Sequence, residues 1–230
     1  GLCIGADANS VEMDRDGAAK RSWEFDGVHG PSSDQAAVFD DVGAPILDAV
    51  LQGYNGTVFA YGQTSSGKTT TIRGDEMREG IIPMCVRQVL DAVNAANQRS
   101  PTSDTWSVKM SYLEIYNEVI RDLLGDDPKA RCELKEDPNK GVYVKGLSNV
   151  VVNDEATINK VMEKGLKHRT TGATLMNEGS SRSHSIFTVV LEMNRRDEGG
   201  KDHFTMGKLN LVDLAAVSYT HLTLPTNREV

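Results

Sequence analysis

Three segments of the chain carry apolar residues at helical spacing. In the first, 33–53, the apolar stripe is followed by Gly53, and a glycine at this place is typical of a helix C-terminus. Pro45 lies inside the segment and is expected to break or restart the helix, because its ring removes a backbone donor and clashes one turn back. The stripe consists of Ile46, Leu47, Val50 and Leu51.

The second and third helical segments cover residues 83–98 and 153–169. Pro83 suits the first position of the second helix, and Asn153 is expected to cap the third. Acidic residues follow Asn153, and basic residues at 167–169 precede Gly172, which suits the helix dipole. The two apolar faces consist of Val86, Val89, Leu90 and Val93, and of Ile158, Val161, Met162 and Leu166.

Strand patterns lie between and after these helices. Residues 56–61 form a short apolar run typical of a buried strand, and residues 106–112 alternate between apolar and polar. Two further strands are expected at 185–193 and 204–212, joined by a turn, whereas the polar stretch 125–141 indicates a loop or a pair of turns. Helices alternating with buried strands predict a three-layer α/β domain, with a central, mostly parallel sheet and helices on both faces.

Composition narrows the class of protein. The 230 residues suit one ordinary domain, or at most two, and no apolar run is long enough to cross a membrane. The three cysteines are far apart and form no CxxC pair, which fits a reducing compartment. The net charge of −8 argues against a general nucleic-acid binder, although a local basic patch could still meet an acidic partner.

One motif points to phosphate chemistry. Residues 62–69 match the phosphate-loop pattern GxxxxGK[ST] and directly follow the strand expected at 56–61. The glycines let the backbone turn its N–H groups toward phosphate oxygens, Lys68 reaches the β- and γ-phosphates, and the Thr69 hydroxyl ligates Mg²⁺. The alternative is a plain Gly/Ser turn before a helix. The residues predicted to bind nucleotide are Gly62, Gln63, Thr64, Ser65, Ser66, Gly67, Lys68 and Thr69.

Two further segments favour a nucleotide site. Asp213 ends the apolar run 209–212, where a carboxylate can hold Mg²⁺ from the other side, although a strand-ending Asp is often only a turn former. Residues 177–184, NEGSSRSH, place three hydroxyls, an Arg and a His between a helix and a strand. They could form a plain solvated loop, or they could close over a γ-phosphate and hold the attacking water.

Four segments together resemble the kinesin motor domain. They are GYNGTVFAYGQTSSGKT (53–69), YLEIYNEVIRDLL (112–124), LMNEGSSRSHSIF (175–187) and KLNLVDLA (208–215). The NEGSSRSH form is far more specific than the phosphate loop, which many families share. The resemblance extends from about residue 22 to Ala215, and GVYVKGLSNVVVN and MGKLNLVDLA are most similar to the ciliary-transport kinesins of the kinesin-2 type.

The resemblance implies roles for individual residues. Those of the first switch are Asn177, Ser180, Ser181 and Arg182, and Asp213 opens the second switch. Of these residues, Asn177 and Ser180 would contact the nucleotide. The implied catalytic residues are Ser181, Arg182 and Asp213, and the implied Mg²⁺ ligands are Thr69, Ser181 and Asp213.

The same resemblance implies ATP and Mg²⁺ as cofactors and the microtubule as partner. Lys135, Lys140 and Lys145 correspond to the lobe that touches β-tubulin, although ordinary solvent exposure explains them equally well. The expected location is the cytoplasm and its microtubule cytoskeleton, including the cilium. We expect no nucleic-acid partner and no membrane insertion, and the native protein is expected to be oligomeric through segments absent here.

The sequence departs from the family at both ends. The family's arginine- and proline-containing adenine cradle is missing, and Thr70 replaces the aromatic residue or His that stacks on adenine, so a poor grip on the base is expected. Ala216, Val217 and Ser218 stand where the family has Gly-Ser-Glu, and Ser218 cannot pair with Arg182. These departures predict a partial motor domain at 1–215 and a non-native tail at 216–230, without relay helix, main microtubule-binding loop or neck linker.

Three functions stay open on the sequence. The first is a truncated, ATP-driven microtubule motor. The second is a non-catalytic fragment that binds nucleotide or tubulin weakly, which the altered second switch favours. The third is another phosphate-loop enzyme, such as a GTPase, which the NEGSSRSH loop disfavours.

Overall fold

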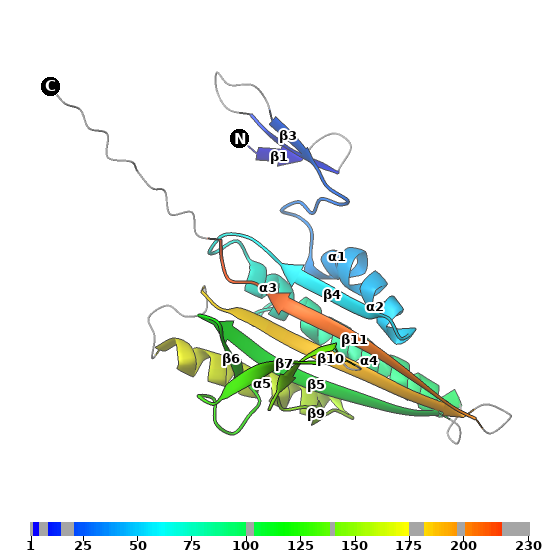
Figure 1. Ribbon diagram of the computed structural model, residues 1–230. Helices are drawn as coiled ribbons and strands as arrows, with labels where there is room; N and C mark the ends of the chain where they lie inside the picture. The colour runs from blue at the N-terminus through cyan, green and yellow to red at the C-terminus, as the bar shows by residue number, and fades with distance from the viewer. Residues whose placement is uncertain are drawn as a thin grey trace.

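The computed structural model describes residues 2–4, 9–14, 21–99, 104–138, 141–174, 182–196 and 201–217. A small antiparallel sheet near the N-terminus, blue in Figure 1, is separate from the larger sheet that organises the rest. Its strands pair in the order β1–β2–β3. They are β1 (Leu2–Ile4), β2 (Ser10–Met13) and β3 (Arg21–Glu24).

The larger sheet has eight strands, in the order β4-β11-β10-β5-β6-β7-β8, with β9 paired to β5. Among these described strands only β4 and β11 pair in parallel, and every other neighbouring pair is antiparallel. The strands are β4 (Asn55–Ala60), β5 (Asp104–Tyr116), β6 (Val119–Asp122), β7 (Arg131–Asp137), β8 (Gly141–Lys145), β9 (Val150–Val151), β10 (His184–Arg196) and β11 (Asp202–Asp213).

The prediction of a mostly parallel sheet is therefore wrong. Parallel strands need a long crossover, usually a helix, whereas strands joined by a short turn pair antiparallel. The turn between β5 and β6 consists of Asn117 and Glu118 at φ +48° and +63°, the positive values that a tight two-residue hairpin requires. β10 and β11 likewise form one long hairpin. The alternation of helix and strand thus holds for the first part of the chain and fails in the second.

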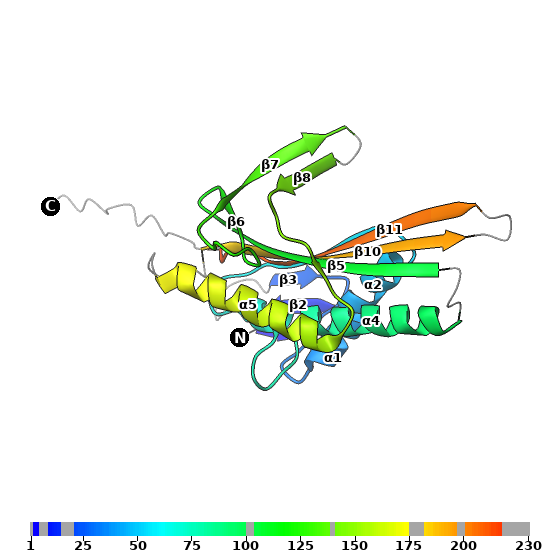
Figure 2. The ribbon, with the colours of Figure 1, turned by 90° about the horizontal axis from the view of Figure 1, so that it is seen from below.

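The helices that pack on the larger sheet lie on one of its faces in the described part of the chain (Figure 2). On β11, Leu209 and Leu211 are buried on that face, whereas Lys208 and Asn210 point to the opposite one. The prediction of helices on both faces of the sheet therefore does not hold for the described residues. The elements are α1 (Gln35–Val38), a π-helical stretch (Phe39–Gly43), α2 (Ala44–Leu51), α3 (Lys68–Arg73), α4 (Ile81–Arg99) and α5 (Glu155–Thr174).

The first two predicted helices are confirmed with adjusted ends. The π-helical stretch ends at Gly43, and Pro45 is the second residue of α2, as expected of a residue that restarts a helix. Gly53 adopts φ +94° just beyond α2. α4 begins two residues before Pro83, and its predicted apolar face is buried. In both helices the apolar stripe therefore indicated which face packs on the sheet.

The third predicted helix is longer than expected. Asp154 rather than Asn153 caps α5, because the Asp154 carboxylate accepts a hydrogen bond from the Thr157 N–H at 2.7 Å. The helix continues to Thr174, past Gly172. Leu166, predicted on the apolar face, is 38% exposed.

Two strand predictions also change. The stretch 125–141, predicted as a loop or a pair of turns, contains β7, which pairs with β6 and β8. β4 is confirmed as a strand, but Phe59 is 62% exposed, so only one of its faces is buried. Within the described residues, no helix is long and apolar enough to span a bilayer.

Candidate functional site

The phosphate-loop motif lies between β4 and α3, as the sequence predicts. Its backbone curls tightly, with Ser65 at φ +62° and Gly67 at φ +91°. A side chain would be strained at Gly67, and a Cβ on Gly62 would come within 2.6 Å of the Ser66 Oγ. A backbone of this shape can direct successive N–H groups toward one anion.

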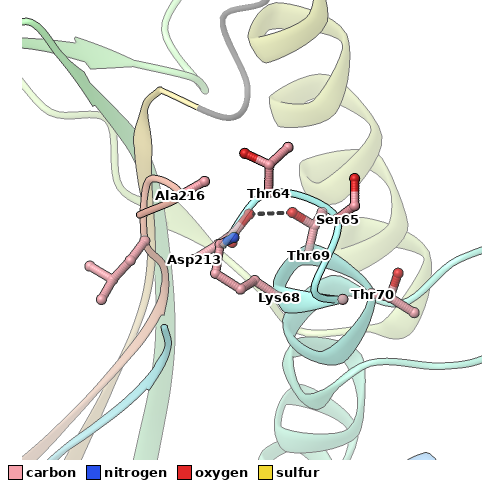
Figure 3. A pocket seen from close by; sticks show the side chains of 9 residues that line it. Thr64, Ser65, Lys68, Thr69, Thr70, Asp213 and Ala216 are labelled. Carbon is pink, nitrogen blue, oxygen red and sulfur yellow. Dashed lines mark hydrogen bonds between the residues drawn. The ribbon is translucent and has the colours of Figure 1, made fainter. Parts of the chain in front are cut away.

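A cavity of about 300 Å³ opens beside this loop, and we call it the loop cavity (Figure 3). The loop and the first turn of α3 form one side, and the end of β11 forms the other. The phosphate loop and Asp213, which the sequence predicts as two parts of one site, therefore line the same cavity. Its lining residues are Thr64, Ser65, Gly67, Lys68, Thr69, Thr70, Asp213, Leu214 and Ala216.

Thr69 and Asp213 meet in the loop cavity. The Thr69 hydroxyl donates a hydrogen bond to Asp213 Oδ2 at 2.7 Å, which leaves the hydroxyl lone pairs available to a cation. The described residues contain no cluster of three or more His, Cys, Asp or Glu side chains that could hold a metal. A hydroxyl with one carboxylate nevertheless fits Mg²⁺, which takes few protein ligands and completes its shell with water and substrate phosphates.

Lys68 supplies the positive charge of the loop cavity. Its ammonium group donates a hydrogen bond to the Gln63 carbonyl oxygen at 2.8 Å, so the side chain folds back over its own loop. This position is suited to an anion held by the loop amides, because the ammonium has further donors.

Two buried residues that the sequence analysis did not select complete the site. Arg169 on α5 donates a hydrogen bond from Nη1 to Asp213 Oδ2 at 3.1 Å, and its Nε lies 3.7 Å from Glu114 Oε1 on β5. Each of the three side chains is at most 8% exposed. One guanidinium thus compensates two buried carboxylates, and Oδ2 of Asp213 accepts hydrogen bonds from both Thr69 and Arg169.

The sequence did carry a signal for Arg169. Ile158, Val161 and Gly165 are buried on α5, and Arg169 continues their row one turn later. At Gly165 the helix approaches the sheet closely, since a Cβ there would lie 2.2 Å from the Tyr112 ring. The basic residues at the end of this segment also suit the helix dipole, which is the role predicted for them from the sequence. In the structure the guanidinium of Arg169 points into the site.

The segment predicted to form the first switch is described only at its end. Asn177, Ser180 and Ser181 lie outside the described residues, and Arg182 is exposed. His184, to which the sequence analysis gave no individual role, accepts a hydrogen bond at Nδ1 from the Ala215 N–H at 3.1 Å. This contact connects the end of the predicted first switch with the start of the predicted second switch.

The chain after Asp213 passes along the phosphate loop. The Val217 N–H donates a hydrogen bond to the Gly62 carbonyl oxygen at 3.0 Å, and Val217 pairs with Gln63 in a parallel bridge. Ala216 lines the loop cavity. The first two residues of the predicted tail thus contact the domain, and residues 218–230 lie outside the described part, so the non-native tail stays a prediction.

Two of the three lysines predicted to face tubulin lie on the β7–β8 hairpin, and Lys140 lies outside the described residues. Lys135 is exposed and pairs with Glu133 at 3.0 Å, while Lys145 is exposed opposite Glu133 in the sheet register. The hydrogen bond from Lys135 and the charges of both lysines lower the pKa of Glu133. Glu133 therefore offsets part of the positive charge on this hairpin.

Comparison with known proteins decides the family. The family model described as the kinesin motor domain matches residues 5–227. This chain belongs to the kinesin family. Kinesin-like protein KIF3C of Mus musculus is 46% identical over 203 residues, which is 86% of this kinesin chain and 25% of that protein. KIF3C of Bos taurus is 45% identical over 202 residues, with the same coverage.

The kinesin fold is found in solved structures as well. The structure of a fast kinesin matches with a TM-score of 0.85 and 37% identity, covering 96% of this chain and 61% of that one. The mixed sheet with its phosphate loop is therefore the kinesin motor fold. The chain spans about a quarter of the length of the KIF3C relatives, which are kinesin-2 proteins, in agreement with the resemblance of the two segments noted above.

Proposed function

We propose that this chain binds Mg·ATP in the loop cavity, and that the intact protein is a microtubule-stimulated motor ATPase. The observation that carries the proposal is the meeting of Thr69 and Asp213 beside a curled phosphate loop, in a chain of the kinesin family. Cation, phosphates and a positively charged lysine can then occupy one site.

In this proposal the backbone N–H groups of residues 62–69 surround the phosphates, and Lys68 adds positive charge. Thr69 and Asp213 would hold Mg²⁺, which would neutralise negative charge on the phosphates. Arg169 is a positioning residue, because it donates to the same Asp213 oxygen as Thr69 and so helps to hold the carboxylate in place. Binding therefore depends on contacts from α3, β11 and α5 together.

The first switch acts on the γ-phosphate in the same proposal. Asn177 and Ser180 would contact the nucleotide, Ser181 would help to hold Mg²⁺, and Arg182 would help to close the loop over the attacking water. Catalysis then comes from positioning and electrostatics rather than from covalent chemistry. The chain after Asp213 must supply a donor to the γ-phosphate and a partner for Arg182.

A second candidate is a chain that binds nucleotide without a hydrolytic response to microtubules. Ala216 lines the loop cavity where the family has a glycine, and its Cβ restricts the backbone conformations that a glycine allows. Ser218 brings no charge to Arg182, and a charge-assisted contact is worth about 1.5–3 kcal/mol. Its loss slows the reaction by roughly 10–100-fold, at about 1.36 kcal/mol per decade.

Binding and turnover separate the two candidates. Titration with a fluorescent ATP analogue and Mg²⁺ tests the site, and Lys68→Ala and Asp213→Asn should each weaken binding. Lys208→Ala is the matched control, since Lys208 points to the opposite face of β11. An ATP affinity that is unchanged by Lys68→Ala would contradict the proposal that the phosphates bind in the loop cavity. Phosphate release measured with and without microtubules then distinguishes a motor ATPase from a non-hydrolysing chain.

We also infer a microtubule partner and a location on the cytoplasmic microtubule cytoskeleton. The exposed lysines of the β7–β8 hairpin support this partner, although Glu133 offsets part of their charge. Co-sedimentation with microtubules at low salt tests it: Lys135→Ala with Lys145→Ala should weaken binding, and Glu133→Gln should strengthen it. Binding that none of these changes alters would contradict a tubulin contact at this hairpin.

A further inference from the structure

A row of polar and charged side chains crosses the face of the larger sheet that the helices cover. In the strand register, Ser185 on β10 is opposite both Asp213 on β11 and Glu114 on β5. Glu114 is in turn opposite Arg121 on β6, and Arg121 is opposite Arg131 on β7. Residues directly opposite one another project from the same face of a sheet. We call these residues the charged row, which leads from the loop cavity to the base of the β7–β8 hairpin.

The Arg169 guanidinium interacts unequally with the two carboxylates of the charged row. Its Nη1 donates to Asp213 Oδ2 at 3.1 Å, whereas its Nε is 3.7 Å from Glu114 Oε1, which is too long for a hydrogen bond. Both carboxylates are buried, and a buried charge is costly unless a group of opposite charge lies close to it. A second cation beside Glu114 would account for the closer approach of Arg169 to Asp213.

Arg121 is in the position that this second cation requires. It lies directly opposite Glu114, and residues so placed have Cβ atoms about 4.5–5.5 Å apart, where opposite charges attract. Arg121 is half-buried, so water and salt screen its charge less than they screen an exposed one. Arg131 differs in both respects, because it is exposed and is opposite Arg121 rather than Glu114. Of these two arginines, Arg121 is therefore the one that can compensate Glu114.

We propose that Glu114 and Arg121 are positioning residues for the binding of Mg·ATP. The charge of Arg121 compensates Glu114, so Arg169 stays hydrogen-bonded to Asp213 and keeps that carboxylate in place in the loop cavity. Without Arg121, the Glu114 carboxylate draws the guanidinium away from Asp213. The inference rests on the proposed function, because Asp213 is the proposed ligand of Mg²⁺.

The test measures the Mg²⁺-dependent binding of a fluorescent ATP analogue to the full chain. Arg121→Met should weaken binding by about tenfold, the lower end of the loss seen when a group that orients a metal ligand is removed. Adding Glu114→Gln to Arg121→Met should restore the affinity, because the competing carboxylate is then gone, whereas a merely structural role predicts further loss. Arg121→Lys keeps the charge and should bind as the wild type does. Arg131→Met is the matched control and should leave the affinity unchanged.

A second readout needs no nucleotide. The Nε–H signal of Arg169 in the NMR spectrum, assigned by its absence in Arg169→Lys, should move downfield in Arg121→Met as Nε–H forms a hydrogen bond with Glu114. It should not move in Arg131→Met. An Arg121→Met affinity equal to that of the wild type, or a double variant that binds no better than Arg121→Met, would overturn the inference and leave the proposed function standing. If the wild-type chain does not bind the analogue, the proposed function fails, and the inference fails with it.

Discussion

Replacing Arg169 with methionine tests the buried ion-pair group under the phosphate loop. The change keeps an unbranched side chain of similar length and removes the charge that faces Asp213 and Glu114. Because all three side chains are at most 8% exposed, water cannot take over the role of the guanidinium. Removing one partner of a buried pair typically costs about 3–5 kcal/mol. That is a large part of a domain's total stability of about 5–15 kcal/mol.

The same sheet offers a matched control. Lys109 and Glu192 form a pair at 2.7 Å, but their side chains are 34% and 26% exposed. Lys109→Met should therefore cost only about 0–1 kcal/mol, since partly exposed pairs gain little beyond hydration. Urea denaturation at one protein concentration, followed by circular dichroism, gives both free energies of unfolding.

A double-mutant cycle sharpens the test. If Arg169 and Glu114 interact, Glu114→Gln should destabilise less in the Arg169→Met background than in the wild type, because the uncompensated carboxylate has been removed. The reasoning is refuted if Arg169→Met costs no more than Lys109→Met, or if the two single changes at 169 and 114 are additive.

Three further predictions concern two cysteines, the cap of α5 and the end of the chain. Burial raises the pKa of Cys85 to about 12, so its thiol should react with a thiol reagent at pH 8 only after unfolding. Burial, followed by the charge of Asp122, also raises the pKa of Cys132, but to a smaller extent. Cys132 should therefore react in the native state, more slowly than a free thiol, and equal reaction rates of Cys85 and Cys132 would contradict this prediction. The hydrogen bond from Thr157 lowers the pKa of Asp154 below 3.8, so Asp154→Ala should lower the melting temperature at pH 7. The difference in melting temperature between the variant and the wild type should shrink below about pH 3.8, because the capping carboxylate is then protonated. Deleting residues 218–230 should leave the melting temperature unchanged if they are a non-native tail, and a clear decrease would place them in the domain.

Local features of this protein follow from the sequence by itself. The apolar stripes at 46–51 and 86–93 identified the buried faces of α2 and α4, because the period of a helix relates residues only three or four positions apart. The phosphate-loop motif was found between a strand and a helix, since its glycines and its neighbours specify a local turn. The four kinesin-like segments were likewise sufficient to identify the family that the comparison confirms.

Only the tertiary structure decided how these pieces meet. Strand direction depends on which strands become neighbours, and short turns in the second half of the chain made the sheet mostly antiparallel. Thr69 and Asp213 are 144 residues apart, and the parallel pairing of β4 with β11 brings the ends of both strands to one edge. Arg169 joins them because Gly165 lets α5 approach β5 closely enough for a buried guanidinium to reach both carboxylates. The distance from the Arg169 guanidinium to these carboxylates cannot be predicted from a local sequence pattern, because it is set by the packing of α5 against the sheet.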